Sequence, residues 1–218
     1  MLAGLPRNGP TDPIEYYRRP LVGRLFRARI NLGLGLLPER QFKRALEVGY
    51  GAGAVQLALA PGVDELHGID LDADALQVAQ LLEIRQCHSK LRQGDVYELP
   101  YEDDSFDLVV SFSVFEHLAQ FGKALLEVAR VLEPGGLFLL GMPAVNKLME
   151  AGFLAIGFRR IDDHHVTTPR AVADKAVELG FLPRGESSLD FPFERPLGAR
   201  LYYNWLFEKP SRPRSVGR

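Results

Sequence analysis

The chain has 218 residues, of which 46% are hydrophobic and 25% charged, enough to bury the core of one globular domain. Its net charge of −2 gives no overall reason to expect nucleic-acid binding. The single cysteine, Cys87, excludes an intramolecular disulfide and favours a reducing compartment.

No part of the chain has the pattern of a targeting or membrane-spanning segment. Residues Met1–Pro13 lack the apolar region of a secretory signal. The longest apolar stretches, Asn31–Pro38 and Ala151–Phe158, are shorter than the roughly 20 residues that a transmembrane helix needs. We therefore expect a cytoplasmic protein.

Residues Ile14–Phe42 have a helical pattern in which arginines alternate with large apolar side chains. Such a helix can pack on a main domain with its arginines in solvent, or it can lie on a membrane surface. The packed helix is the preferred interpretation. We expect a helical cap over 1–43, a main domain over 44–209 and a flexible tail over 210–218.

From Arg44 onward, apolar segments alternate with helical segments. The predicted strands are Ala45–Val48, Glu65–Ile69, Lys90–Gln93, Phe106–Phe112, Leu137–Met142, Glu186–Phe191 and Arg200–Glu208. The predicted helices are Ala54–Ala60, Asp74–Arg85 with Asp72 as its cap, Phe121–Leu132, Asn146–Phe158, and Arg170–Leu179 with Thr168 as its cap and Gly180 at its end. This alternation predicts an α/β fold with a mostly parallel sheet.

The run Leu46-Glu47-Val48-Gly49-Tyr50-Gly51-Ala52-Gly53 joins the first of these strands to a helix. Its three glycines leave the turn nearly free of side chains, so a ligand can touch the backbone. Asp70 follows at about the ~20-residue spacing of a dinucleotide fingerprint and is placed to accept both hydroxyls of a ribose. Taken alone, this pattern fits a dinucleotide, another adenosine compound or a purely structural turn.

Acidic residues also follow later strands. Asp95, in Gly94-Asp95-Val96, ends a parallel strand, where open α/β sheets bind ligands; its carboxylate can accept the adenine amino group, and the next N–H can donate to the ring. By contrast, Asp70-x-Asp72-x-Asp74 lacks the glycine and the final acid of a calcium loop, so we predict no metal there.

Taken in order, these motifs resemble those of the class I S-adenosylmethionine-dependent methyltransferases, particularly the group termed type 11. The resemblance covers about half of the chain. Its matching runs are Leu46–Gly53, Gly68-Ile69-Asp70-Leu71-Asp72, Gly94-Asp95-Val96 through Leu99-Pro100, Ser105–Ser111 and Arg130-Val131-Leu132-Glu133-Pro134-Gly135-Gly136.

The resemblance implies a Rossmann-like three-layer sandwich whose seven-stranded sheet has an antiparallel last strand. It further implies S-adenosylmethionine as cofactor and S-adenosylhomocysteine as product. The residues implied to bind the cofactor are Glu47, Gly49, Tyr50, Gly51 and Gly53 at the methionine end, Asp70 at the ribose, Leu71, Asp95 and Val96 at the adenine, and Ser111 near the methionine amino group. Tyr50 departs from the small or polar residues common at its position.

An activated methyl group needs mainly an in-line nucleophile, and a base only where that nucleophile carries a proton. His117, in Phe115-Glu116-His117-Leu118 after the fourth strand, is the candidate base because imidazole titrates near neutrality. Alternatively, Glu116 and His117 orient the loop or cap the next helix. His164 and His165 could line the pocket edge, and we do not expect them to bind a metal.

We expect a small-molecule methyl acceptor, with specificity set by Ile14–Phe42, Asn146–Val166 and Glu194–Tyr203. Three alternatives stay open: a methyltransferase acting on a macromolecule, a non-catalytic relative that binds S-adenosylmethionine, and a nicotinamide-dependent oxidoreductase. The first would call for a basic face or an added domain, which the sequence does not indicate. The Asp95 and Glu133-Pro134-Gly135-Gly136 signals disfavour the oxidoreductase.

Overall fold

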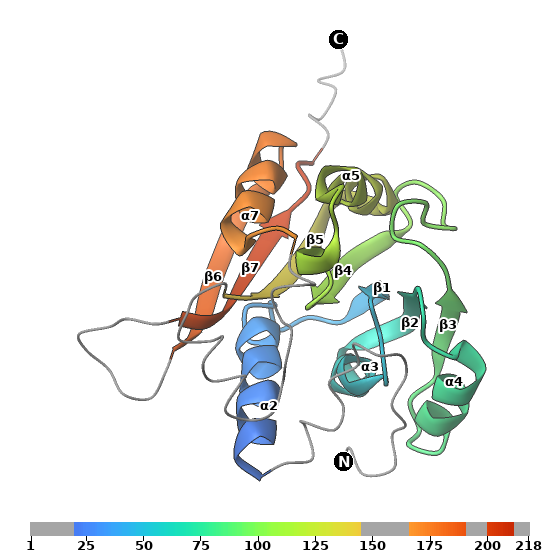
Figure 1. Cartoon of the computed structure of the whole chain (residues 1–218). Coiled ribbons are helices and arrows are strands. Elements are labelled where there is room, and N and C mark those ends of the chain that lie inside the picture. Colours follow the sequence, from blue (N-terminus) through green and yellow to red (C-terminus); the bar gives the residue numbers. More distant parts are fainter. Residues whose placement is uncertain (1–19, 145–165, 191–199, 212–218) are drawn as a thin grey trace.

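The computed structural model of the protein describes residues 20–144, 166–190 and 200–211. Its centre is a seven-stranded sheet with the order β3-β2-β1-β4-β5-β7-β6 (Figure 1). The strands are β1 (Phe42–Val48), β2 (Val63–Asp70), β3 (Ser89–Gln93), β4 (Phe106–Phe112), β5 (Leu132–Pro143), β6 (Leu182–Asp190) and β7 (Arg200–Glu208). The first five pair in parallel, whereas β7 runs antiparallel to both β5 and β6. The predicted fold class is confirmed.

Helices cover both faces of the sheet (Figure 1). One face carries α2 (Pro20–Leu34), α3 (Ala54–Leu59) and α4 (Ala75–Glu83), and the other carries α5 (Phe121–Val131) and α7 (Pro169–Glu178). Two short 3-10 turns, η1 (Ala60–Gly62) and η2 (Phe115–His117), complete the described helical segments.

The central strand β4 is apolar because helices bury both of its faces. Along β4, Leu108 and Val110 join the core beneath α3 and α4, whereas Val109 joins the core beneath α5 and α7. All seven residues of β4 are buried, including Asp107, whose carboxylate accepts the backbone N–H groups of Lys43 and Arg44. This two-sided burial explains why a central parallel strand has so few polar residues.

The sequence located most of these elements, although several boundaries differ. The strands β1, β2 and β6 begin at Phe42, Val63 and Leu182, where residues 45, 65 and 186 were predicted. Asp74, and not Asp72, caps α4: its side chain accepts the N–H of Gln77 at 3.0 Å. Asp72 instead lies in the preceding turn, where its N–H donates to Asp70. The fifth strand begins at Leu132 rather than at residue 137, because Gly135 and Gly136 exchange backbone hydrogen bonds with Lys209. The predicted helix over 146–158 lies outside the described residues.

The helix α2 packs against the β5, β6 and β7 part of the sheet. Phe26 and Ile30 are buried in the shared core. The Asn204 side chain donates to the carbonyl of Arg29 at 3.2 Å, and the Ser187 hydroxyl donates to the carbonyl of Leu32 at 3.0 Å. Because the apolar face of α2 is occupied by the sheet, the structure supports the packed helix over the membrane-surface alternative. None of the helices in the described ranges is long and apolar enough to cross a membrane.

A close approach between α2 and the sheet makes Gly33 sensitive to substitution. A Cβ at this position would lie 2.8 Å from Oδ1 of Asn204 and 2.8 Å from the Phe112 ring. We expect Gly33→Ala to lower the free energy of unfolding by about 1–3 kcal/mol, since overpacking outweighs the gain in helix propensity. Urea unfolding followed by circular dichroism measures the effect.

Gly122 in α5 provides the control, because a Cβ there would meet only Lys175 Cε at 3.7 Å. Gly122→Ala should leave stability unchanged or raise it by up to about 1 kcal/mol. Equal unfolding midpoints for the two variants would contradict the close docking of α2.

Candidate active site

The carboxyl ends of β1, β2, β3 and β4 lie along one edge of the sheet. The chain leaves β1 toward β2 on one side, while β4 lies on the other, so the strand order reverses at β1. Open α/β sheets bind ligands at such a crevice. The edge brings together residues at or just beyond the ends of four strands: Gly49, Asp70, Asp95 and Ser113.

The glycine turn after β1 has a backbone that other residues rarely adopt. The φ angles of Gly49, Gly51 and Gly53 are 80°, 47° and 81°. Gly53 is the residue preceding α3, and its N–H donates to the carbonyl of Tyr50 at 2.7 Å. The left-handed backbone explains the glycines directly, and their missing side chains place no Cβ between the turn and a ligand.

Tyr50 contributes no side chain to this edge. Its ring is buried, with 2% exposure, and its hydroxyl donates to the carbonyl of Ala73 at 3.4 Å. A Cβ on Gly68 would come within 2.9 Å of the ring, so the tyrosine packs on the bare backbone of β2. Only the backbone of Tyr50 is left to meet a ligand at the turn.

Asp70 ties the glycine turn to the loop after β2. Its Oδ2 accepts the N–H of Gly51 at 2.8 Å, and its Oδ1 accepts those of Asp72 and Ala73, both at 3.0 Å. A carboxylate offers about four lone-pair sites, of which these bonds use three. The remaining site, on Oδ2, can accept one ribose hydroxyl, whereas the sequence suggested two.

Residues expected around an adenine lie on the neighbouring loops. Leu71 exposes 62% of its surface, so its side chain is accessible to cover a ring. Asp95 is exposed, and its Oδ1 accepts the N–H of Tyr97 at 2.9 Å. The Val96 side chain is buried at 8% exposure, which leaves its backbone for any ligand contact.

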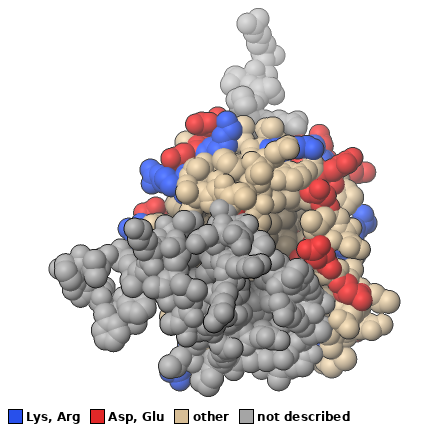
Figure 2. All heavy atoms as spheres, in the orientation of Figure 1, with Lys and Arg blue, Asp and Glu red and all other residues tan. Residues whose placement is uncertain are grey.

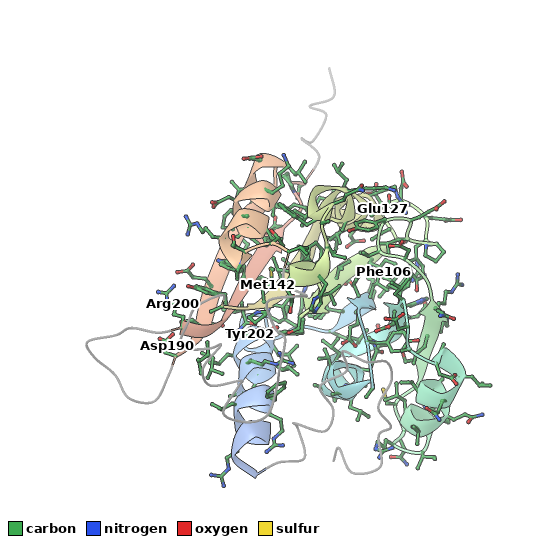
Figure 3. The ribbon with its side chains drawn as sticks, viewed as in Figure 1. Phe106, Glu127, Met142, Asp190, Arg200 and Tyr202 are labelled. Carbon is green, nitrogen blue, oxygen red and sulfur yellow. The ribbon has the colours of Figure 1, made fainter. Side chains whose placement is uncertain are left out.

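Two residues of α5 hold the loop that carries Asp95, and the sequence did not assign them a role. Glu127 accepts the N–H of Leu99 at 2.8 Å. Arg130 donates to the carbonyls of Leu99 and Tyr101 at 2.9 and 2.7 Å and forms an ion pair with Glu127. In the sequence, the only sign of this role was the i, i+3 spacing of Glu127 and Arg130 on one helix, which is typical of an ion pair. Glu127 lies on α5, close to this loop (Figure 3).

Glu47 lies buried at the end of β1, with 2% exposure. Gln56 of α3 donates to its Oε2 at 2.7 Å, and Gln56 in turn accepts the Ser89 hydroxyl at 2.6 Å. Burial raises the pKa of Glu47 to about 8; the Gln56 hydrogen bond lowers that pKa and the nearby charge of Asp70 raises it. A buried carboxyl of this kind becomes easier to ionise when a cation binds beside it. Sequence analysis missed Gln56, a polar residue on the buried side of a short helix.

The raised pKa of Glu47 makes folding stability depend on pH. The unfolded chain loses this proton near 4.5, whereas the folded chain keeps it up to about 8. Stability therefore falls as pH rises across that window, by up to about 1.4 kcal/mol per pH unit for one group. Glu47→Gln should remove this contribution, so its stability relative to the native protein should increase steadily with pH.

Urea titrations at several pH values between about 5 and about 8 measure this dependence. A control is Glu102→Gln, because the Glu102 side chain is exposed. A difference between Glu47→Gln and the native protein that stays constant with pH would contradict the buried, proton-holding state of Glu47.

A second group of polar side chains lies beyond β4. Ser113 has a φ of 57°, and its hydroxyl accepts from Nη1 of Arg29 at 2.8 Å and pairs with the Tyr202 hydroxyl at 2.9 Å. Tyr202 lies near the end of α2 (Figure 3). Glu116 is 1% exposed, and His117 Nε2 lies 4.0 Å from Glu116 Oε1 with 35% of the His117 side chain exposed. These residues come from α2, η2 and β7 as well as from the strand end.

The remaining predicted residues lie in different places. Ser111 is completely buried in β4, and its hydroxyl has no hydrogen-bond partner within the described ranges. His164 and His165 lie outside the described residues. Over the part of the chain that is described, no three His, Cys, Asp or Glu side chains come together to hold a metal ion.

Comparison with known proteins finds similarity over part of the chain. The family model for a methyltransferase domain matches residues 46–140. The uncharacterized methyltransferase YcgJ of Bacillus subtilis is 38% identical over 99 residues, which are 44% of this chain and 39% of YcgJ. The demethylmenaquinone methyltransferase of Staphylococcus aureus (strain JH9) is 34% identical over 117 residues, which are 52% of this chain and 47% of that enzyme. The chain thus spans less than half of the length of either relative.

The same fold occurs in the N-methyltransferase NodS of Bradyrhizobium japonicum WM9, solved in complex with S-adenosylhomocysteine. NodS superimposes with a TM-score of 0.68, covering 90% of this chain and 96% of NodS at 21% identity. At this identity the likeness concerns the fold, whereas the family model matches the sequence over residues 46–140. Residues 46–140 are therefore similar in sequence to a methyltransferase domain, and the chain shares the fold of NodS.

Proposed function

We propose that the chain binds S-adenosylmethionine at the edge formed by β1, β2 and β3 and transfers its methyl group to a small molecule. The observation that carries this proposal is the Asp70 clamp, which holds the bare glycine turn and the β2–α4 loop together with one carboxylate. Such a clamp presents backbone groups and one acceptor site to an adenosine ligand.

The residues present fit this cofactor. Glu47 and the turn from Gly49 to Gly53 would hold its methionine end, where a buried carboxyl suits a cationic neighbour. Asp70 would accept a ribose hydroxyl, and the exposed Leu71 would cover the adenine.

Two further contacts complete this assignment. Asp95 and the backbone of Val96 would bind the adenine edge, since Asp95 uses only Oδ1 within its own loop. Ser111, whose hydroxyl has no partner among the described residues, would meet the methionine amino group. When bound, the cofactor supplies a methyl group activated by a sulfonium with a neutral thioether as leaving group. The protein's part is to align the acceptor with that group.

Several observations support a small acceptor over a macromolecule. On the face shown in Figure 2, the described surface carries acidic and basic side chains together rather than a basic area suited to RNA. The demethylmenaquinone methyltransferase of Staphylococcus aureus also takes, by its name, a small molecule. The proposal includes a location in the cytoplasm. The buried free thiol of Cys87 is in keeping with such a reducing compartment.

Calorimetric titration tests the cofactor. S-adenosylhomocysteine should bind, and NADH, which shares the adenosine part, should not compete for the same site. Binding of NADH without S-adenosylhomocysteine would favour the oxidoreductase alternative. Transfer of labelled methyl groups to a metabolite extract then separates an active enzyme from a relative that binds the cofactor without turnover.

A further inference from the structure

We propose that Glu116 accepts the proton of a hydroxyl group on the methyl acceptor, while Ser113, Tyr202 and Arg29 hold the reacting oxygen. The proposal rests on the proposed function and names its acceptor class: an acidic hydroxyl compound, such as a phenol or an enol, methylated on oxygen. It also places the base one residue before His117, the candidate that the sequence favoured.

The position and burial of Glu116 carry the first part of this inference. The residue lies in η2, just beyond the carboxyl end of β4, and is only 1% exposed. Its Oε2 has no hydrogen-bond partner within the described residues. A buried carboxyl oxygen without a partner is costly in a folded protein, and a hydroxyl group of a bound acceptor would satisfy it. His117, by comparison, exposes 35% of its side chain to solvent.

The hydroxyl and guanidinium groups beside Glu116 carry the second part. The Ser113 hydroxyl lies between Nη1 of Arg29, at 2.8 Å, and the Tyr202 hydroxyl, at 2.9 Å. The guanidinium of Arg29 also stacks over the Tyr202 ring at 5.0 Å. These donors and the positive charge stabilise an oxygen that gains negative charge, and they disfavour an ammonium group.

The strained backbone of Ser113 favours a functional role for this group of side chains. A φ of 57° is costly for a residue with a Cβ. In this conformation the serine hydroxyl meets groups from α2 and β7 at one point. Strained backbones of this kind gather at functional sites, where they aim a side chain.

The electrostatics of Glu116 suit proton transfer near neutrality. Burial raises the pKa of Glu116 to about 8, while its own backbone N–H, the Arg29 charge and the Ser113 hydroxyl lower that pKa. The charged or titratable groups around it are Arg29 from α2, His117 from η2 and, through Ser113, Tyr202 from β7. When the pKa of a base lies near the working pH, a useful fraction of the base is unprotonated. The same base still binds a proton strongly enough to take it from the acceptor.

In the step itself, Glu116 takes the proton as the O–H bond of the acceptor breaks. The electron pair of that bond forms the new bond from oxygen to the methyl carbon. The pair of the broken carbon–sulfur bond stays on sulfur, which leaves as a neutral thioether. Glu116 later releases the proton to water, so no oxidant or reductant is involved.

The test compares Glu116→Gln, His117→Gln and the exposed control Glu102→Gln. Purified proteins receive S-adenosylmethionine with a 13C-labelled methyl group and a small-molecule extract of the source cells. The chemical shift of the transferred carbon distinguishes methyl groups on oxygen from those on nitrogen, carbon or sulfur. We expect an O-methyl product, a fall in the rate of methyl transfer of at least about 100-fold in Glu116→Gln, and a rise of that rate with pH that His117→Gln and Glu102→Gln retain.

Each other outcome is decisive. A methyl group on nitrogen, carbon or sulfur would overturn the acceptor class, and an O-methyl product formed as fast by Glu116→Gln would overturn the base. A protein that binds S-adenosylhomocysteine but labels no compound would overturn the acceptor proposal while leaving cofactor binding intact. Failure to bind S-adenosylhomocysteine would instead contradict the proposed function.

A measurement without an acceptor provides a second test. In protein with 13C-labelled glutamate carboxyls and saturated with S-adenosylhomocysteine, the resonance missing from Glu116→Gln belongs to Glu116. That resonance should titrate well above the range of the exposed glutamates. Titration within their range would overturn the proposal, and matching melting temperatures would show that Glu116→Gln is folded.

Discussion

Asp70→Ala is expected to weaken the binding of S-adenosylhomocysteine by about 100-fold or more. The substitution removes the acceptor offered to the ribose and three hydrogen bonds to the backbone N–H groups of Gly51, Asp72 and Ala73. A hydrogen bond to a charged group contributes about 1.5–3 kcal/mol, and unpaired amides add to the loss. Calorimetric titration measures the affinity directly.

Asp72→Ala is the matched control, because Asp72 is exposed on the same loop and its side chain has no hydrogen bond within the described residues. This variant should bind S-adenosylhomocysteine within about threefold of the native affinity. Asp70→Asn keeps one acceptor oxygen and should lie between the two. Equal affinities for Asp70→Ala and Asp72→Ala would mean that the ribose binds elsewhere.

Gly49→Ala is expected to lower the free energy of unfolding by about 2–4 kcal/mol and to abolish cofactor binding. Gly49 has a φ of 80°, which costs an alanine roughly 1–2 kcal/mol. A Cβ there would also lie 2.2 Å from Cγ2 of Val114, so the loop after β4 must move away from the turn. Chemical unfolding and titration with S-adenosylhomocysteine measure the two effects.

The two causes can be separated with variants at Val114 and Gly62. In Gly49→Ala/Val114→Ala the clash is relieved, and the double variant should lose less stability than the sum of the single variants. Gly62→Ala adds a methyl group with no heavy atom within 4 Å and should be nearly neutral. Additive losses in the double variant would show that the loop after β4 does not press on the turn.

Much of the candidate site at the sheet edge could be predicted because its sequence signals are local. The glycines specify a left-handed turn at the residues where it occurs, and the positions of Asp70 and Asp95 follow from where the strands end. The helix caps Thr168 and Gly180 were also predictable, since capping depends on a few neighbouring residues. The cap of α4 was misplaced by two residues because Asp70, Asp72 and Asp74 are all suitable and only the backbone path selects Asp74.

The tertiary structure decided how these groups are used. The sequence by itself determined the alternation of strands and helices, the bare turn and the order of the acids along the chain. It could not show that the Asp70 carboxylate accepts three backbone N–H groups, or that the Tyr50 side chain packs into the core. Arg29, Ser113 and Tyr202 meet across separations of 84 and 89 residues. Contacts of that range leave no local pattern, because they form only once α2 and β7 pack against the ends of the parallel strands.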